Sequence, residues 1–193
     1  MNKEDLCEFI DVYQDHESNF EDTMCQGDIF RSDAITFQIQ NPESICGWIL
    51  VNATCDLVRK GKTDFLRFIP IRPLDFFIKE NQEQGKRKIQ TLLDIIIKYN
   101  SLKAFFLPPS TKFGGGKPHY AELGYILSLP VTIDFEELTE QLLKFRLASI
   151  KYPWREKLAE SLSNSFYRIG VPEPPENWNE WRDLYMDEFF ESK

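Results

Sequence analysis

The sequence predicts an α+β protein with a small, compact β core and a helical C-terminal half. Short runs in which apolar residues alternate or follow one another fill residues 28–71, which is typical of strands. Residues 86–99 carry apolar side chains at helical spacing and predict a helix that is inserted into the β core or packed across it. After Pro130 the spacing is helical almost throughout. At 193 residues the chain can bury one ordinary core.

The first part of the chain is expected to form one short helix and then strands. Residues 5–13 place large apolar side chains at helical spacing, and a loop follows as far as Gln26. The expected strands comprise residues 28–30, 34–40, 46–53 and 65–71. Because proline lacks the N–H that a ladder needs, Pro70 and Pro73 predict that the last of these strands lies near a sheet edge.

Shorter strands and several helices are expected after the helix at residues 86–99. Strands are predicted at residues 103–107 and 121–129. Helices are predicted at 135–150 and 154–169, the second with Pro153 in its first turn and Gly170 as its C-terminal cap. The chain is thereby divided into an acidic helix and loop (1–25), a β domain (26–130) and a helical region (131–193).

Charge is distributed unevenly along the chain, whose formal net charge is −8. Residues 1–25 sum to 1 − 8 = −7 and residues 173–193 to 2 − 7 = −5, so the segment between them sums to −8 + 12 = +4. This balance argues against tight nonspecific binding of nucleic acid. Local basic patches remain, which are either solvated surface or phosphate contacts: Arg59, Lys60, Lys62 and Arg67, and then Lys86, Arg87 and Lys88.

Targeting signals and cysteine pairs are not expected. No apolar run approaches the roughly 20 residues that span a bilayer, and the acidic N-terminus lacks the basic flank of a signal peptide. We therefore expect a cytoplasmic protein without membrane contact. None of the four cysteines (Cys7, Cys25, Cys46 and Cys55) shows C-x-x-C spacing, so free, mostly buried thiols are expected rather than disulfides or a zinc site.

Few residues suggest catalytic chemistry. His16 and His119 are the only histidines, which excludes a histidine-rich metal cluster, and no metal or cofactor is expected. Cys55 and His119 could form a nucleophile and base with Asp56 nearby, although chance occurrence explains them better. The run Gly114-Gly115-Gly116 lacks the spacing of a phosphate-binding loop and favours a surface loop.

The C-terminal segment carries an aromatic stripe at spacings of three and four residues, opposite an acidic face. Such a stripe either packs on the parent domain or binds a partner. We take it as the candidate protein-binding site, and its members are Trp178, Trp181, Tyr185 and Phe189.

Residues 26–74 resemble the start of the MazF/PemK toxin family in three motifs, Gly27-Asp28-Ile29-Phe30, then 47–51 and then 68–71. The resemblance implies that the β domain is an SH3-like barrel and that the chain cleaves RNA. In that family an arginine before the central strand and a threonine or serine ending the next strand form the catalytic pair. The corresponding places here hold Cys46 and Arg72.

A second resemblance covers residues 52–58, 107–109, 146–158 and 167–170, which are similar to uncharacterised bacterial proteins from mobile-element and defence loci. It implies that residues 26–170 form one unit.

Two functions follow as expectations. The leading one is a non-enzymatic protein-binding or regulatory component of a bacterial defence or toxin–antitoxin-like system, with a protein as its partner. The alternative is a diverged MazF/PemK-like endoribonuclease, for which the acidic charge disfavours RNA as a ligand. Its phosphate or RNA contacts would be Arg31, Arg59, Arg67 and Arg72.

Overall fold

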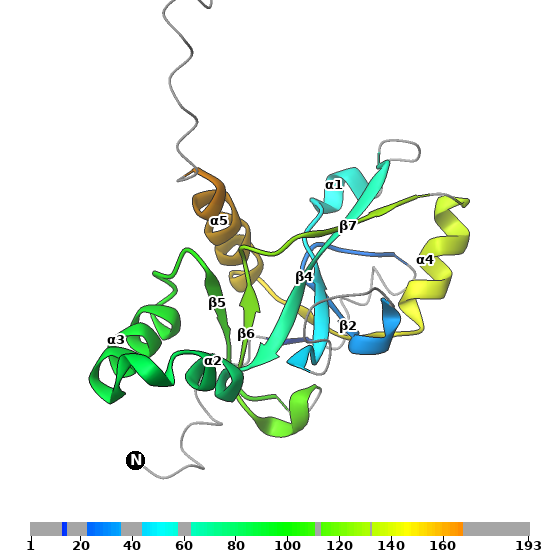
Figure 1. Ribbon diagram of the computed structural model, residues 1–193. Helices are drawn as coiled ribbons and strands as arrows, with labels where there is room; N and C mark the ends of the chain where they lie inside the picture. The colour runs from blue at the N-terminus through cyan, green and yellow to red at the C-terminus, as the bar shows by residue number, and fades with distance from the viewer. Residues whose placement is uncertain are drawn as a thin grey trace, which may run out of the picture.

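The computed structural model describes residues 13–14, 23–35, 44–57, 63–110, 113–131 and 133–167, which form an α+β fold around one curled antiparallel sheet (Figure 1). Within these residues the strand order is β1-β8-β2-β3-β4-β6-β5, and β7 pairs with the free part of β4. The strands are β1 Tyr13–Gln14, β2 Asp28–Arg31, β3 Gly47–Leu50, β4 Phe65–Pro73, β5 Ala104–Leu107, β6 His119–Glu122, β7 Leu127–Pro130 and β8 Arg146–Ile150.

Five α-helices and three 3-10 turns connect the strands in the described residues. The helices are α1 Thr54–Leu57, α2 Leu74–Glu80, α3 Lys86–Ile97, α4 Phe135–Leu143 and α5 Trp154–Tyr167. The 3-10 turns are η1 Ser32–Ala34, η3 Gln82–Gln84 and η4 Gly114–Gly116. The helix predicted at residues 86–99 and the strand predicted at 103–107 are thereby confirmed as α3 and β5. No helix in the described residues is long and apolar enough to cross a membrane.

Strand β4 lies in the middle of the sheet, so the prediction that it lies near an edge is wrong. It pairs with β3 along one side, and on the other side with β7 through residues 65–68 and with β6 through residues 71–73. Pro70 falls between these last two stretches, where a missing N–H costs no ladder hydrogen bond. Pro73 ends the strand.

The prediction of one helix over residues 135–150 is also wrong in its second half. Helix α4 ends at Leu143, and strand β8 pairs with β1 and β2. Ala148 and Ile150 alternate into one core while Ser149 faces the other side, which is the two-residue period of a strand. The sheet therefore includes residues on both sides of position 130.

Other boundaries differ from the prediction as well. The strand expected at 121–129 is two strands, β6 and β7, separated by a turn at Gly124. Tyr13, expected to end a helix, lies in β1, while residues 5–12 are outside the described residues. Ala34 belongs to the 3-10 turn η1 rather than to a strand at 34–40, of which residues 36–40 are not described.

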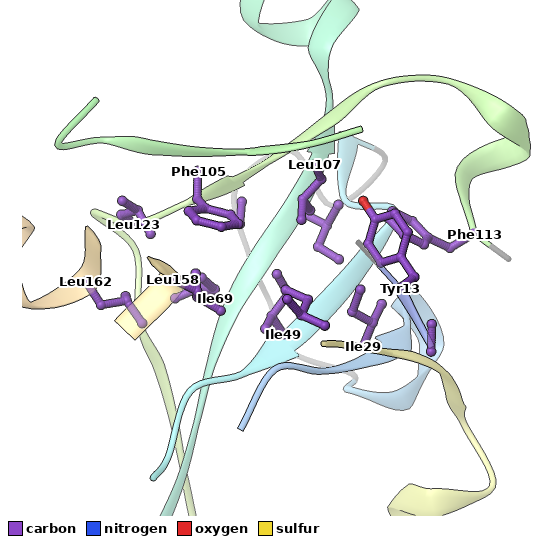
Figure 2. Close-up of a cluster of buried hydrophobic side chains, with 14 residues drawn as sticks. Tyr13, Ile29, Ile49, Ile69, Phe105, Leu107, Phe113, Leu123, Leu158 and Leu162 are labelled. Atoms are coloured by element: carbon purple, nitrogen blue, oxygen red, sulfur yellow. The ribbon is translucent and has the colours of Figure 1, made fainter. Parts of the chain in front are cut away.

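Both faces of the sheet are covered. Figure 2 shows the first core, where Ile69 lies beside Leu158 of α5, Ile29 lies near Tyr13, and Ile49 lies between them. The opposite face packs against α4 through a second core, whose buried members are Met24, Phe30, Ile35, Ile45, Trp48, Leu50, Leu57, Leu66, Phe68 and Leu142. Because successive residues of a strand point to opposite faces, one strand supplies both cores, as Trp48 and Ile49 show.

A third, smaller core holds α2 and α3 against β5 and β6 through Leu74, Ile96, Ala104 and Tyr120. Helix α3 therefore lies at the end of the molecule next to β5, and α4 lies at the opposite end (Figure 1). The two helices lie on opposite sides of the molecule (Figure 1).

Candidate functional site

A buried carboxylate, Asp28, joins three segments at the start of β2. Asp28 is 0% exposed, and its Oδ2 accepts hydrogen bonds from the Cys25 backbone N at 2.8 Å and from Arg146 Nη1 at 3.2 Å. Ser149 Oγ donates to Oδ1. Arg146 Nη1 also donates to the Thr23 carbonyl at 2.8 Å. These residues are called the Asp28 junction below.

The register of β2 and β8 produces this junction. Asp28 lies directly opposite Ser149, and an irregularity after Ile29 brings Arg146 opposite Phe30, on the face that Asp28 shares. A buried charge is stabilised by a partner of opposite charge and by further hydrogen bonds. Asp28 has Arg146 as the partner charge, and the Cys25 backbone N and Ser149 Oγ as hydrogen-bond donors. The junction therefore holds the sheet together, and its carboxylate is not available to a substrate.

The segments around the junction are those on which the second sequence resemblance depends. The Gln26 backbone N donates to Thr54 Oγ1 at 3.1 Å, which joins the junction to residues 52–58. Arg155 Nε donates to the Ile150 carbonyl at 3.2 Å, which joins it to residues 146–158. Gly27 has φ +87° and a Cβ there would lie 3.3 Å from Ile150 Cβ, so this crossing favours glycine.

Two of the four arginines predicted as phosphate contacts are neutralised within the protein. Arg31 makes a bidentate pair with Asp33, with Nε 2.9 Å from Oδ1 and Nη2 2.7 Å from Oδ2, and its guanidinium lies 5.0 Å from the centroid of the Phe145 ring. These hydrogen bonds lower the pKa of Asp33 below its usual value and keep the pair charged. A bidentate pair occupies the donors that would bind a phosphate.

Arg72 is buried rather than exposed in a basic groove. Its Nε lies 2.9 Å from Glu122 Oε2, Nη1 donates to Ser44 Oγ, and the guanidinium lies 5.0 Å from the centroid of the Phe76 ring. The pair joins β4 to β6, which are neighbours in the sheet. In this arrangement Arg72 holds the sheet together.

The structure does not bring the arginine candidates together. Arg67 is exposed on β4, five residues before Arg72, which is about 17 Å along a strand. The odd separation also directs the two side chains to opposite faces of the sheet. Arg59 and the aromatic stripe (Trp178, Trp181, Tyr185 and Phe189) lie outside the described residues.

Cys55 and His119 do not form a catalytic pair. Cys55 is exposed at α1, beyond the end of β3 that pairs with Phe68, whereas His119 pairs with Pro73 at the other end of β4. Phe68 and Pro73 are five residues apart, which is about 17 Å along a strand. Cys25, Cys46 and Cys55 are free thiols, as predicted, but only Cys25 is fully buried. Burial raises the pKa of the Cys25 and Cys46 thiols, which keeps them protonated and unreactive.

Protonation of His119 is expected to lower the stability of the fold. The side chain is 2% exposed and its Nδ1 lies 2.7 Å from the Lys117 carbonyl. Burial is the main cause that lowers its pKa below the ordinary 6.5. The folded state therefore resists a proton that the unfolded chain accepts below about pH 6.5, so the free energy of unfolding falls as the pH falls through that value.

Urea unfolding at pH 7.5 and pH 5.5 measures this effect. The unfolding free energy of the wild type should decrease between the two pH values more than that of His119→Gln, which has no proton to gain. An equal decrease in both proteins would show that His119 does not carry the pH dependence.

The glycine run forms the 3-10 turn η4 on the surface. Gly115 and Gly116 have φ values of +65° and +74°, which favour glycine, and no atom lies within 4 Å of where a Cβ would be. Phe113 anchors the turn by packing on Tyr13, with ring centroids 5.1 Å apart. The Gly116 amide already donates to the Ser110 carbonyl at 2.9 Å, so this amide has an internal acceptor.

Helix α3 has exposed apolar side chains on both flanks of its buried stripe. Ile96 faces the sheet and is buried, whereas Ile95 is 38% and Ile97 is 46% exposed. Lys86, Arg87 and Lys88 in its first turn are exposed, and none of them makes an ion pair within the described residues. The sequence could have indicated this exposure. Six of the twelve residues of α3 are apolar, and they form a wider stripe on the helix than one sheet face covers.

The described part of the chain contains no group of three or more His, Cys, Asp or Glu side chains that could hold a metal ion. No family model, no curated protein and no solved structure matches this chain.

Proposed function

We propose that this protein is a non-enzymatic protein-binding or regulatory component whose α3 helix contacts a partner. The observation that carries the proposal is the incomplete cover of α3. Ile96 is buried and Ile89, Leu92 and Leu93 are half-buried, whereas Ile95 and Ile97 are exposed on the two flanks of this buried stripe. Exposed apolar surface rimmed by charged residues is typical of protein interaction sites.

The electrostatics of α3 support the same function. Its first turn holds three cations and no acidic residue, although the positive end of a helix dipole favours anions. Gly85 at the N-cap gives no side-chain hydrogen bond to this end. Because this arrangement does not stabilise the helix, it favours a role in recognition.

The internal arginine pairs support a binding function over a nuclease. Arg31 and Arg72 are paired with carboxylates, and Arg67 lies on the opposite face of β4 from Arg72. We propose that the curled sheet derives from an SH3-like barrel that has kept its scaffold and uses it for binding. The resemblance to bacterial defence-locus proteins supports a cytoplasmic role in a defence or toxin–antitoxin-like system.

Affinity purification from the native cells tests the proposal. We compare the full chain, an Ile95→Ser/Ile97→Ser variant and a chain truncated after Gly170, and we sequence any copurified RNA. A protein that copurifies with the full chain and is lost from the serine variant is expected, because the variant removes the apolar contact. A protein lost only on truncation would support binding through the aromatic stripe instead of α3.

The nuclease alternative predicts a different result in the same experiment. RNA would copurify with all three chains, would be cleaved on incubation with the purified protein, and would be released by Arg67→Ala. That outcome would contradict a non-enzymatic role.

A further inference from the structure

A second helix presents chemistry complementary to α3. Glu136, Glu137 and Glu140 are exposed on one side of α4, and Ile133, just before the helix, is 42% exposed. Residues 133–144 contain four carboxylates and one lysine, 1 − 4 = −3. Residues 86–98 contain four cations and one aspartate, 4 − 1 = +3. Each helix thus combines exposed isoleucine with charge of one sign.

Capping explains only part of the acidic face. Asp134 accepts hydrogen bonds from the backbone N of Glu136 at 2.8 Å and of Glu137 at 3.3 Å, and carboxylates in the first turn suit the helix dipole. Glu140 lies beyond the first turn, and no ion pair of its side chain occurs within the described residues. Neither effect explains the exposed Ile133.

The two surfaces cannot meet within one copy of the chain. Helix α3 packs beside β5, the last strand of the sheet, whereas α4 packs on the face of the sheet that carries the second core, on the other side of the molecule (Figure 1). A contact between them therefore requires two molecules.

We propose that the partner of α3 is the acidic face of α4 on a second copy of this chain. The inference rests on the proposed protein-binding function and names the partner. Lys88 and Ile95, which lie seven residues apart on the same side of α3, face the acidic side of α4, with Lys88 near the carboxylates and Ile95 near Ile133. Because two different surfaces form the contact, the assembly is head-to-tail and continues into a ring or an open chain. Exposed charge pairs are screened by salt, so the association weakens as ionic strength rises.

Sedimentation equilibrium of the full chain and three variants tests this contact. Variant A is Lys86→Glu/Lys88→Glu and variant B is Glu137→Lys/Glu140→Lys. The matched control is Glu156→Lys/Glu160→Lys, which changes the same charge as variant B on exposed positions of α5. Circular dichroism checks that each variant is folded.

The wild type and the control should exceed the monomer mass of 22.8 kDa as concentration rises at low salt. Variants A and B should each associate at least about tenfold more weakly, because like charges then face one another. A mixture of A and B should recover association, since every contact between an A and a B copy pairs opposite charges.

Two results would overturn the inference. One is a wild type that stays monomeric up to several hundred micromolar at low salt, and the other is association that the exchanged charges neither weaken nor restore. In both cases the proposed function would still stand if a different protein bound to α3 in the purification experiment. Failure of this inference is therefore distinguishable from failure of the proposed function.

Discussion

Replacing Asp28 by alanine is expected to lower the free energy of unfolding by about 3–5 kcal/mol, because it leaves the buried Arg146 guanidinium without its carboxylate. The same change removes the acceptor of the Cys25 backbone N and of Ser149 Oγ. Urea unfolding followed by circular dichroism measures the loss.

Two comparisons make this prediction specific. Asp33→Ala removes an exposed carboxylate from Arg31 and should leave the urea midpoint almost unchanged. Adding Arg146→Met to Asp28→Ala removes the buried charge that has lost its carboxylate and should recover part of the loss. An unfolding free energy of Asp28→Ala within about 1 kcal/mol of wild type would show that the junction does not hold the sheet.

Replacing Trp48 by alanine is expected to cost about 3–5 kcal/mol of unfolding free energy, the usual range for a large aromatic in a core. Trp48 is 1% exposed, lies on β3 in the second core, and its Nε1 donates to the Ser32 carbonyl at 3.2 Å. The alanine variant leaves a cavity among side chains of β2, β4 and α4 and removes this hydrogen bond.

Trp48→Phe provides the control for this prediction. It keeps most of the ring volume and loses the indole N–H, so its urea midpoint should lie between those of wild type and Trp48→Ala. Equal midpoints for the phenylalanine and alanine variants would mean that the hydrogen bond, and not packing, carries the stability at this position.

Local patterns predicted the parts of the fold that depend on neighbouring residues. The period of apolar residues in α3 and the apolar run of β4 were visible in the sequence. Strand β8 was not, because Leu147 and Ile150 also fit the helical spacing of the residues before them. Its place between β1 and β2 depends on pairing with Tyr13 and Asp28, more than 100 residues away.

The candidate sites show the same limit. Arg72 looked available for phosphate because its partners Ser44 and Glu122 lie 28 and 50 residues away in the chain. The structural role of Asp28 was not predicted because its partners Arg146 and Ser149 lie 118 and 121 residues away in the chain. The charge of α3 was noted from the sequence, but the exposure of Ile95 and Ile97 depends on how much of the helix the sheet covers.

These observations make α3 the centre of the functional account. The helix is anchored by Ile96 and by its contacts with β5, so its exposed isoleucines are held in place before a partner arrives. Such preorganisation lowers the entropic cost of binding. A rigid sheet that presents one basic, apolar helix suits a component that recognises another protein.

Photo-cross-linking from position 95 in living cells tests that account most directly. A photoreactive phenylalanine analogue replaces Ile95 in the full chain, and the same analogue at the exposed Asn164 on α5 is the control. The account predicts a discrete protein adduct from position 95 that Lys86→Glu/Lys88→Glu removes and that position 164 does not give. Adducts to RNA alone, or none from position 95, would contradict it.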